Sequence, residues 1–386
     1  MTVADLFATA AYWEYPVACW RRPGATMPEA VISLQLELLT GQPPTLESGP
    51  AGFAFFPFVD SDRSPALWLP ADGYHDGHAL HGAAPATLEG WQLLFEAMVP
   101  ATPPHPPHPP QPPQPLPFCA DETAYRALVS AGVAALAAGV ARKVVPSRAA
   151  VRRLPLDFDT WTAFERLCAA YPQAFVSLVS VPSHGRWLGA SPELLAEVAD
   201  GRKFRTVALA GTQAAPPDAP PEAARWSQKE LEEQAHVTRY VIDCFKHLRL
   251  REYEEVGPRT VRAGHLWHLR TDYSVDLTQV PFPTLGTDML RLLHPTSAVA
   301  GMPREAALAW LREHEGYNRS YYSGFLGPVN LPTTGTSAVY VNLRCMQLRE
   351  DEAILYAGAG LTPESDPARE WTETEEKLRI VAEVVL

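Results

Sequence analysis

Apolar residues recur at helical spacing in several stretches of the chain. Residues 121–139 carry them every three or four positions behind an acidic start, which suits the positive end of a helix dipole. Residues 228–248 form a longer stretch of this kind, and there Glu233 falls in line with Val237 and Val241. A carboxylate that leans toward an apolar face needs a partner, and an arginine or Mg²⁺ would serve. We predict further helices at residues 158–172, 284–296, 304–315 and 370–385.

Short apolar runs bounded by glycine and proline predict the strands. They occur at residues 52–60, 64–75, 141–155 and 174–181. Residues 336–348 and 352–361 have the pattern of a hairpin pair. Because helices and strands come in clusters rather than in strict alternation, the predicted class is α+β, with antiparallel β-sheets packed against helices.

A proline-rich segment at residues 103–117 divides the chain. Proline at this density excludes helices and inner strands and favours polyproline II. We interpret the segment as a surface loop or linker, with a recognition ligand for an SH3-like partner as the open alternative. The predicted organisation is an N-terminal part at residues 1–102, this linker, and a catalytic region at residues 118–386.

The charge of the chain limits its partners. It has 44 Asp and Glu against 32 Lys and Arg, for a net charge of −12. Nucleic-acid backbones require an excess of basic residues, so we expect no nucleic-acid binding, and any bound anion needs a local cluster of cations or a metal. His75, His78 and His81 repeat every three residues, but the glycines of this stretch disfavour a helix that presents them together to a metal.

The five cysteines are scattered and none has CxxC spacing. This usage indicates reduced thiols in a cytoplasm and no zinc ribbon. The N-terminal residues carry acids early and do not form a secretory signal. No uncharged apolar run approaches the roughly 18 residues of a membrane span. We therefore expect a cytoplasmic protein that does not enter a membrane.

One lysine on a predicted strand could carry chemistry. Lys143 comes directly before Val144 and Val145, with Arg142 and Arg148 on either side. The stretch alone favours a solvated basic cluster, since most lysines are exposed. Because neighbouring side chains on a strand point to opposite faces, a solvated Arg142 would direct Lys143 inward.

The last predicted helix carries a charged pair close to two glycines. Glu373 and Lys377 are four residues apart and share a helix face, which also describes an ordinary surface ion pair. Gly358 and Gly360 precede the helix, at the end of a predicted strand. Glycines at a strand end let a ligand approach the backbone closely, which favours a binding site.

Several separate motifs occur in the order found in one family. They are KVVPSR (143–148), WLGASPELL (187–195), ALAGTQ (208–213), WSQKELEEQ (226–234), the segment 292–329 that begins LLHPTSAVAGMP, VNLRCM (341–346), YAGAGL (356–361) and SDPAREWTETEEKL (365–378). On these motifs the chain resembles the chorismate-utilising enzymes, and within them the isochorismate synthases, over roughly residues 118–386. Gln213, Gln234 and Ser297 depart from the usual arginine, histidine and proline, and the N-terminal region matches weakly.

The resemblance implies a fold with the active site in a cleft between its two halves, and a role for each matching residue. Lys143 would be the general base that activates water, and Glu193 the general acid that protonates the departing hydroxyl group. These roles require that the pKa of Lys143 fall, through desolvation or nearby cations such as Mg²⁺ or Arg148, and that the pKa of Glu193 rise. Glu233 and Glu373 would hold Mg²⁺. The implied substrate-binding residues are Gly211, Thr212, His268, Tyr322, Arg344, Gly360 and Lys377.

Three positions bear on the reaction within the family. Lys143 resembles the members that use water, whereas anthranilate synthases usually have glutamine there and take ammonia from an amidotransferase partner. Ala210 stands where aminodeoxychorismate synthases commonly have a nucleophilic lysine, and HPTSAVAG resembles the isochorismate synthase loop. The expected activity is therefore an isomerase that converts chorismate to isochorismate, without an amidotransferase subunit. Salicylate synthase and a catalytically lapsed chorismate-binding protein are the alternatives.

The sequence says less about the oligomeric state and the pathway than about the reaction. We expect a monomer whose isochorismate serves menaquinone biosynthesis, and a siderophore pathway remains the alternative.

Overall fold

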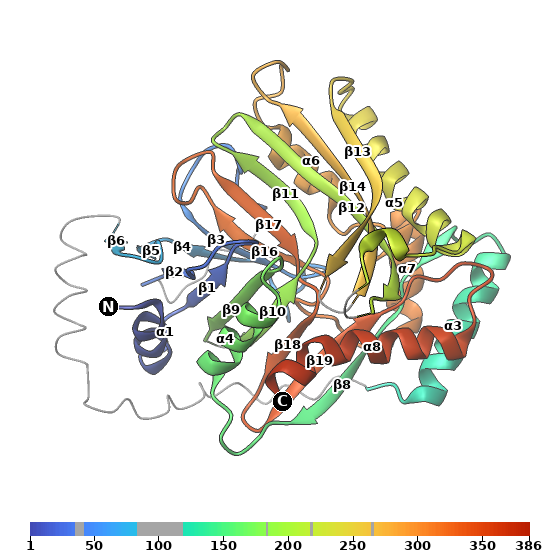
Figure 1. Ribbon diagram of the computed structural model, residues 1–386, viewed down its shortest axis with the longest axis horizontal. Coiled ribbons are helices and arrows are strands. Elements are labelled where there is room, and N and C mark those ends of the chain that lie inside the picture. Colours follow the sequence, from blue (N-terminus) through green and yellow to red (C-terminus); the bar gives the residue numbers. More distant parts are fainter. Residues whose placement is uncertain (35–41, 83–118, 183, 217–218, 264–265) are drawn as a thin grey trace.

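The computed structural model describes residues 1–34, 42–82, 119–182, 184–216, 219–263 and 266–386. The proline-rich segment predicted at residues 103–117 lies outside these described residues. The described chain forms two large antiparallel sheets and a two-stranded ladder, with helices on the outer faces (Figure 1). The predicted α+β class, with antiparallel sheets packed against helices, is confirmed.

The larger sheet has nine strands in the order β6-β5-β2-β1-β9-β10-β18-β19-β8. Its strands are β1 (Val17–Arg21), β2 (Glu29–Ile32), β5 (Gly73–His75), β6 (Leu80–Gly82), β8 (Ser147–Arg153), β9 (Phe175–Val181), β10 (Gly185–Ser191), β18 (Cys345–Leu348) and β19 (Glu352–Gly358). The N-terminal strand β1 pairs with β9, which lies beyond the proline-rich segment. Residues from both sides of that segment therefore build one sheet.

The second sheet has eight strands in the order β13-β14-β12-β11-β17-β16-β3-β4. Its strands are β3 (Gly52–Phe56), β4 (Leu67–Pro70), β11 (Leu194–Ala199), β12 (Lys203–Ala214), β13 (Glu254–Ala263), β14 (Leu266–Asp276), β16 (Phe325–Val329) and β17 (Ser337–Val341). Here the N-terminal residues enter through β3, which pairs with β16. A separate ladder joins β7 (Lys143–Val144) to β15 (Gly301–Met302).

Aromatic side chains fill the space between the two large sheets. The rings of Phe175 from β9 and Tyr340 from β17 stack with centroids 4.2 Å apart. Trp20 from β1 and Phe53 from β3 lie 5.2 Å apart in the same cluster. The sheets thus pack face to face, as in a sandwich, and each needs helices to cover its outer face.

Most of the helices cover these outer faces. The helices are α1 (Val3–Tyr12), α3 (Glu122–Ala137), α4 (Thr160–Ala170), α5 (Gln228–His247), α6 (Leu285–Leu293), α7 (Arg304–His314) and α8 (Pro367–Val385). Helices α1, α4 and α8 pack on the nine-stranded sheet, and α5 and α6 on the eight-stranded sheet (Figure 1). Helix α3 packs on α8, and α7 packs on the ladder of β7 and β15. In the part of the chain that the structure describes, no helix is both long enough and apolar enough to cross a membrane.

The six helices predicted from periodicity are confirmed as α3 to α8, and α1 was missed. Thr2 and Asp5 form a capping box at the start of α1, in which each side chain accepts a hydrogen bond from the backbone N–H of the other residue. This Thr-x-x-Asp spacing is a helix-start signal that could have revealed the helix.

The predicted hairpin of residues 336–348 and 352–361 is only partly correct. Strands β18 and β19 do pair, but β17 belongs to the other large sheet. The chain leaves one sheet at Asn342 and enters the other at Cys345, and Arg344 adopts a positive φ of 49° between them. Residues 336–348 therefore connect the two sheets instead of forming one strand.

Candidate active site

Two chain crossings between the large sheets lie side by side and define the site. One runs from β10 through Pro192 and Glu193 into β11, and the other runs from β17 through Arg344 into β18. Hydrogen bonds tie them together: Val341 N donates to Glu193 O at 3.0 Å, and Ala190 N donates to Arg344 O at 3.0 Å. Glu193 and Arg344, 151 positions apart in the sequence, are thereby held at one junction.

Lys143 is fully buried, whereas Arg142 beside it is exposed. The inward direction predicted for Lys143 is therefore correct, but strand alternation is not its cause, because β7 begins at Lys143 and Val144 and Val145 are buried as well. The Lys143 Nζ donates to Glu233 Oε1 on α5 at 3.0 Å. The partner that Glu233 requires is therefore this lysine, and not the arginine that the sequence suggested as an alternative to Mg²⁺.

Gly360 lies against this ion pair. A Cβ atom at this position would be 2.7 Å from Glu233 Oε1 and 3.0 Å from Lys143 Cε. The first distance is shorter than real Cβ contacts, so any side chain would displace the pair. At Gly360 the groups that approach the backbone closely are these two side chains, and approach by a ligand stays a prediction.

Helix α5 presents Glu233 because its start and its buried face are both well fixed. Ser227 and Glu230 form a capping box at its first turn. Gln234, the next residue after Glu233, is buried and donates to Ala208 O at 3.2 Å and to Thr271 Oγ1 at 3.0 Å. These bonds attach the helix to β12 and β14 and set the direction of Glu233.

Helix α8 brings a second charged pair to the site. Its cap is Asp366, whose side chain accepts from two backbone N–H groups, followed by proline at the first helical position. Lys377 Nζ donates to Glu373 Oε1 at 2.7 Å and to Gly358 O at 2.8 Å. The predicted ion pair therefore forms and also contacts the glycine strand end.

Sequence reasoning missed a further ion pair next to these residues. Glu370 is 1% exposed, and its Oε1 accepts from Lys229 Nζ at 2.5 Å. Its other oxygen, Oε2, is buried without a hydrogen-bond partner. Burial and the neighbouring Glu373 raise the pKa of Glu370, which Lys229 opposes. Both residues lie within the motifs quoted above, and the burial of Glu370 is the signal that only the structure supplies.

His268 on β14 is held in one tautomer. The ladder between β12 and β14 is interrupted between Ala210 and Gln213, and Gly211 has a positive φ of 61° there. Its carbonyl lies 2.9 Å from His268 Nδ1 and can only accept, so Nδ1 carries the proton. Burial lowers the pKa of His268 to about 3, which keeps the ring neutral. Its Nε2 is therefore a buried acceptor that no protein group uses.

The charges around Glu193 oppose each other. Burial raises the pKa of Glu193 to about 7, although Lys143, Arg344 and Lys377 each act to lower it. The predicted direction of the shift is confirmed, and desolvation is its cause. For Glu233, burial also favours the neutral form, but the ammonium groups of Lys143 and Lys377 prevail and the pKa falls. The two carboxyl groups thus differ in protonation near neutral pH.

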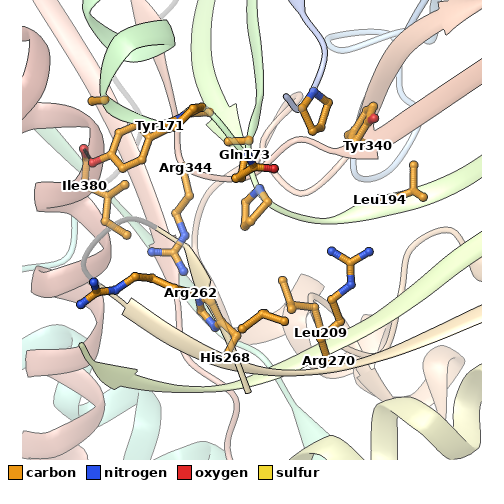
Figure 2. A pocket seen from close by; sticks show the side chains of 17 residues that line it. Tyr171, Gln173, Leu194, Leu209, Arg262, His268, Arg270, Tyr340, Arg344 and Ile380 are labelled. Carbon is orange, nitrogen blue, oxygen red and sulfur yellow. Dashed lines mark hydrogen bonds between the residues drawn. The ribbon is translucent and has the colours of Figure 1, made fainter. Parts of the chain in front are cut away.

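A cavity of about 640 Å³ opens onto this junction (Figure 2). Figure 2 shows Arg344 and His268 directed toward its centre from opposite walls, with Arg270 and Leu209 on the side of His268. The described residues that line the cavity include three arginines and no aspartate or glutamate. Arg344 Nη1 is buried there without a hydrogen-bond partner. A free guanidinium donor and a free imidazole acceptor suit an anionic, hydroxylated ligand.

Of the remaining predicted residues, Tyr322 and Thr212 lie close to site residues, whereas Arg148 contacts α8. Tyr322 is buried, and its hydroxyl lies 3.4 Å from the position that a Cβ of Gly358 would take. Thr212 Oγ1 lies 3.4 Å from His268 Nδ1. Arg148, suggested as a cation beside Lys143, instead donates to Thr374 and Glu375 and lies over the ring of Trp371. Its guanidinium is therefore engaged with α8.

Metal binding is compatible with these carboxylates only if other ligands take part. Among the described residues, no group of three His, Cys, Asp or Glu side chains forms a metal cluster. Two of the histidines considered for a metal have different protein partners. His81 pairs with Asp76 at 2.8 Å, and His75 Nε2 lies 3.1 Å from Met1 O. Glu370 pairs directly with Lys229, and Glu370, Glu373 and Glu233 together raise the pKa of Lys229 against the effect of its burial.

Known proteins resemble this chain in sequence and in structure. A family model described as "Chorismate binding enzyme" matches residues 94–386. Isochorismate synthase EntC of Escherichia coli K12 is 32% identical over 270 residues, which cover 68% of this chain and 67% of EntC. The structure of MenF, the menaquinone-specific isochorismate synthase of E. coli, aligns with a TM-score of 0.77 and 22% identity over 98% of this chain and 91% of MenF.

An enzyme named for a different reaction has a similar fold. Anthranilate synthase component I from Streptococcus pneumoniae aligns with a TM-score of 0.67 and 18% identity, over 95% of this chain and 90% of that one. The match of the family model over most of the chain, together with the identity to EntC, establishes the family. The chain belongs to the chorismate-binding enzymes.

Proposed function

We propose that this enzyme converts chorismate to isochorismate. The observation that carries the proposal is the pair of buried groups with opposite tasks, Lys143 at 0% exposure and Glu193 with its pKa raised to about 7. A base and an acid held in one water-poor junction suit a reaction that adds water at one carbon and removes a hydroxyl group at another. The names of EntC and MenF, both isochorismate synthases, support the same reaction.

The reaction balances with these two groups. Lys143, in its neutral form, takes a proton from a water molecule as the oxygen bonds to C2 of the ring. The ring double bond shifts, the C4–O bond breaks, and Glu193 donates its proton to the departing hydroxyl group, which leaves as water. One water enters and one leaves, so the product is an isomer of the substrate.

The substrate is a dianion, and the junction offers cations and donors for it. Arg344 would bind one carboxylate with its guanidinium, whose Nη1 is without a protein partner. Lys377 and the backbone N–H groups near Gly211, Thr212 and Gly360 would contact the remaining oxygen atoms. His268 Nε2, as a free acceptor, would receive a hydrogen bond from a substrate hydroxyl group.

Mg²⁺ fits the carboxylates of this site. It takes one or two protein carboxylates and completes its six oxygen ligands with water and substrate, so a cluster of three side chains is unnecessary. Glu233 and Glu373 would hold it, and the charge of Glu373 acts on the buried carboxyl group of Glu370. When bound, the metal supplies positive charge that balances a substrate carboxylate.

The direct test is to identify the product. Purified protein is incubated with chorismate and Mg²⁺, and the mixture is separated by chromatography with isochorismate and salicylate as standards. We expect isochorismate, in reversible equilibrium with chorismate. Salicylate together with pyruvate would identify the alternative activity, and unchanged chorismate would identify a binding protein without turnover.

Replacement of Glu233 by alanine tests the metal assignment. We expect the Mg²⁺ concentration for half-maximal rate to rise at least about tenfold, because metal affinity depends strongly on each carboxylate ligand. The measurement is the rate of isochorismate formation across a Mg²⁺ titration. Glu232→Ala is the matched control, since Glu232 is exposed on the same helix and accepts a hydrogen bond from Gln228 at 2.8 Å. An unchanged titration in Glu233→Ala contradicts the assignment.

The pathway remains a separate prediction. MenF is described as menaquinone-specific, and we propose menaquinone biosynthesis for this enzyme as well. A strain that lacks the gene is expected to require added menaquinone precursors for anaerobic growth, while its siderophore output stays normal.

A further inference from the structure

A buried ion pair directly after α7 is used by none of the steps above. Glu315 and Arg319 are 7% and 2% exposed. Arg319 donates through Nε to Glu315 Oε2 at 2.8 Å and through Nη2 to Glu315 Oε1 at 2.7 Å. Its guanidinium also lies 4.2 Å from the centre of the Phe58 ring. The pair is thus fixed both by a two-pronged hydrogen bond and by an aromatic surface.

The other hydrogen bonds of the pair go to two chain segments, residues 145–147 and residue 299. Arg319 donates to Val145 O at 2.6 Å and to Val299 O at 2.8 Å. Glu315 Oε1 accepts from Ser147 N at 2.7 Å and from Ser147 Oγ at 2.8 Å. All of these partners flank the ladder of β7 and β15, which contains Lys143. The ion pair therefore contacts the chain immediately after the lysine strand and immediately before its partner strand.

The lysine strand is short and is held by its neighbours on two sides. Besides its ladder with β15, Val144 O accepts a hydrogen bond from Leu361 N at 2.8 Å. Strand β7 has two residues, and its ladder pairs Lys143 with Met302 and Val144 with Gly301. Two-stranded ladders of ordinary length are already marginal in stability, and this one is shorter. A Cβ atom on Gly301 would lie 2.2 Å from Lys143 O, so the two strands approach very closely. A small displacement of either strand would move Lys143.

The chemistry of the pair suits positioning better than stabilisation. Burying two opposite charges removes their hydration, and their attraction often does little more than offset that loss. A planar guanidinium that donates in three directions fixes the relative position of the groups it joins, which a lysine cannot do. Here it joins Glu315, Val145 and Val299, so it fixes the two strands of the ladder relative to each other.

We propose that Glu315 and Arg319 are positioning residues for Lys143. They hold the ends of β7 and β15 so that the Nζ atom of Lys143 points at Glu233 and at the site where water attacks. The proposal rests on the role of Lys143 given under the proposed function. It predicts that damage to the pair slows the chemical step and leaves substrate affinity nearly intact.

The first test is Arg319→Lys, which keeps the charge and removes the planar fork. We expect kcat to fall about 10- to 100-fold, as for a reacting group displaced by about 1 Å, with KM for chorismate and the half-saturating Mg²⁺ concentration within about threefold of wild type. Arg22→Lys is the matched control, because Arg22 pairs with Glu29 at 2.6 Å in the same way and donates to Leu331 O. Its kcat is expected to stay within about twofold.

A second variant guards against loss of folding. Ser147→Ala removes one donor to Glu315 and keeps the backbone N–H, and we expect a fall in kcat of about 3- to 10-fold without a change in KM. Thermal unfolding checks that each variant is folded. If Arg319→Lys does not fold, the kcat of Ser147→Ala tests the proposal instead. Wild-type kcat in a folded Arg319→Lys or Ser147→Ala, or an equal loss in Arg22→Lys, overturns the proposal.

A crystal structure separates this proposal from the proposed function. Wild-type protein that makes no isochorismate overturns the function, whatever the variants do. The position of Lys143 is still observable in that case, by comparing crystals of wild type and Arg319→Lys. We expect the contact of 3.0 Å between Lys143 Nζ and Glu233 Oε1 to be lost or lengthened in the variant. An unchanged contact overturns the positioning role.

Discussion

Replacement of Lys143 by alanine is expected to lower kcat by about 10³-fold while Mg²⁺-dependent binding of chorismate remains. The expected loss lies within the 10²- to 10⁴-fold range of a positioned general base. Lys143 is the only lysine among the described residues with no exposed surface, and its Nζ lies at the junction with Glu193. Binding survives because Arg344 and Lys377 still face the substrate carboxylates, and Glu233 keeps Lys377 and Lys229 as neighbouring cations.

Two measurements decide this prediction. Product formation is followed by chromatography, and chorismate binding is followed by calorimetry with and without Mg²⁺. Arg142→Ala is the control, since Arg142 is exposed and its backbone N–H, which donates to Met302 O at 2.7 Å, is unchanged by the substitution. If Lys143→Ala retains more than about a tenth of the wild-type kcat, the base is another group. If it loses binding together with turnover, the lysine holds substrate instead.

Local patterns were sufficient for the parts of the site that lie within one element. Helical spacing predicts the contact of Glu373 with Lys377, which forms at 2.7 Å. Helical geometry repeats about every four residues, so a short stretch of sequence contains it. Strand alternation also placed Arg142 outside and Lys143 inside, which is what the structure shows, although Arg142 lies just before β7.

Contacts between distant segments could not be read in this way. The crossing at Arg344 looked like an uninterrupted strand, because the apolar residues on both sides of it are buried in either sheet. Arg148 looked like a surface cation, yet it is 3% exposed, since Thr374 and Glu375 on α8 accept its hydrogen bonds. These outcomes depend on which elements meet in the fold, and no periodicity within a segment records that.

Motif resemblance bridged part of this gap. It assigned Glu193 and Lys143, fifty positions apart, to one site, and the structure places both in the same electrostatic field. It did not assign partners within the site. In the direct ion pairs of Lys143 with Glu233 and of Lys229 with Glu370, one member is buried and the other is partly exposed. Charges removed from water must find partners, and the nearest opposite charge serves.

Replacement of Glu193 by glutamine is expected to lower kcat by about 10²- to 10³-fold and to change the pH profile. Burial raises the pKa of Glu193 from its ordinary 4.5 to about 7, and the protonated form is the one that can donate to the departing hydroxyl group. Glu193 is then protonated in about nine tenths of the enzyme molecules at pH 6 and in about one tenth at pH 8. The wild-type rate should therefore fall as the pH rises through 7, and the glutamine variant should lack that decline.

The pH profile separates this role from simple loss of structure. Glu197→Gln is the matched control on the neighbouring strand β11, where Glu197 is partly exposed and pairs with Arg205 at 3.4 Å. It should keep both the rate and the alkaline decline, which is measured as kcat and kcat/KM from pH 5.5 to 9. A glutamine variant that is slow but still declines above pH 7 shows that another group donates the proton. A variant with the wild-type rate shows that departure of the hydroxyl group needs no protein acid, because glutamine preserves the shape and hydrogen-bonding capacity of Glu193 but has no proton to transfer.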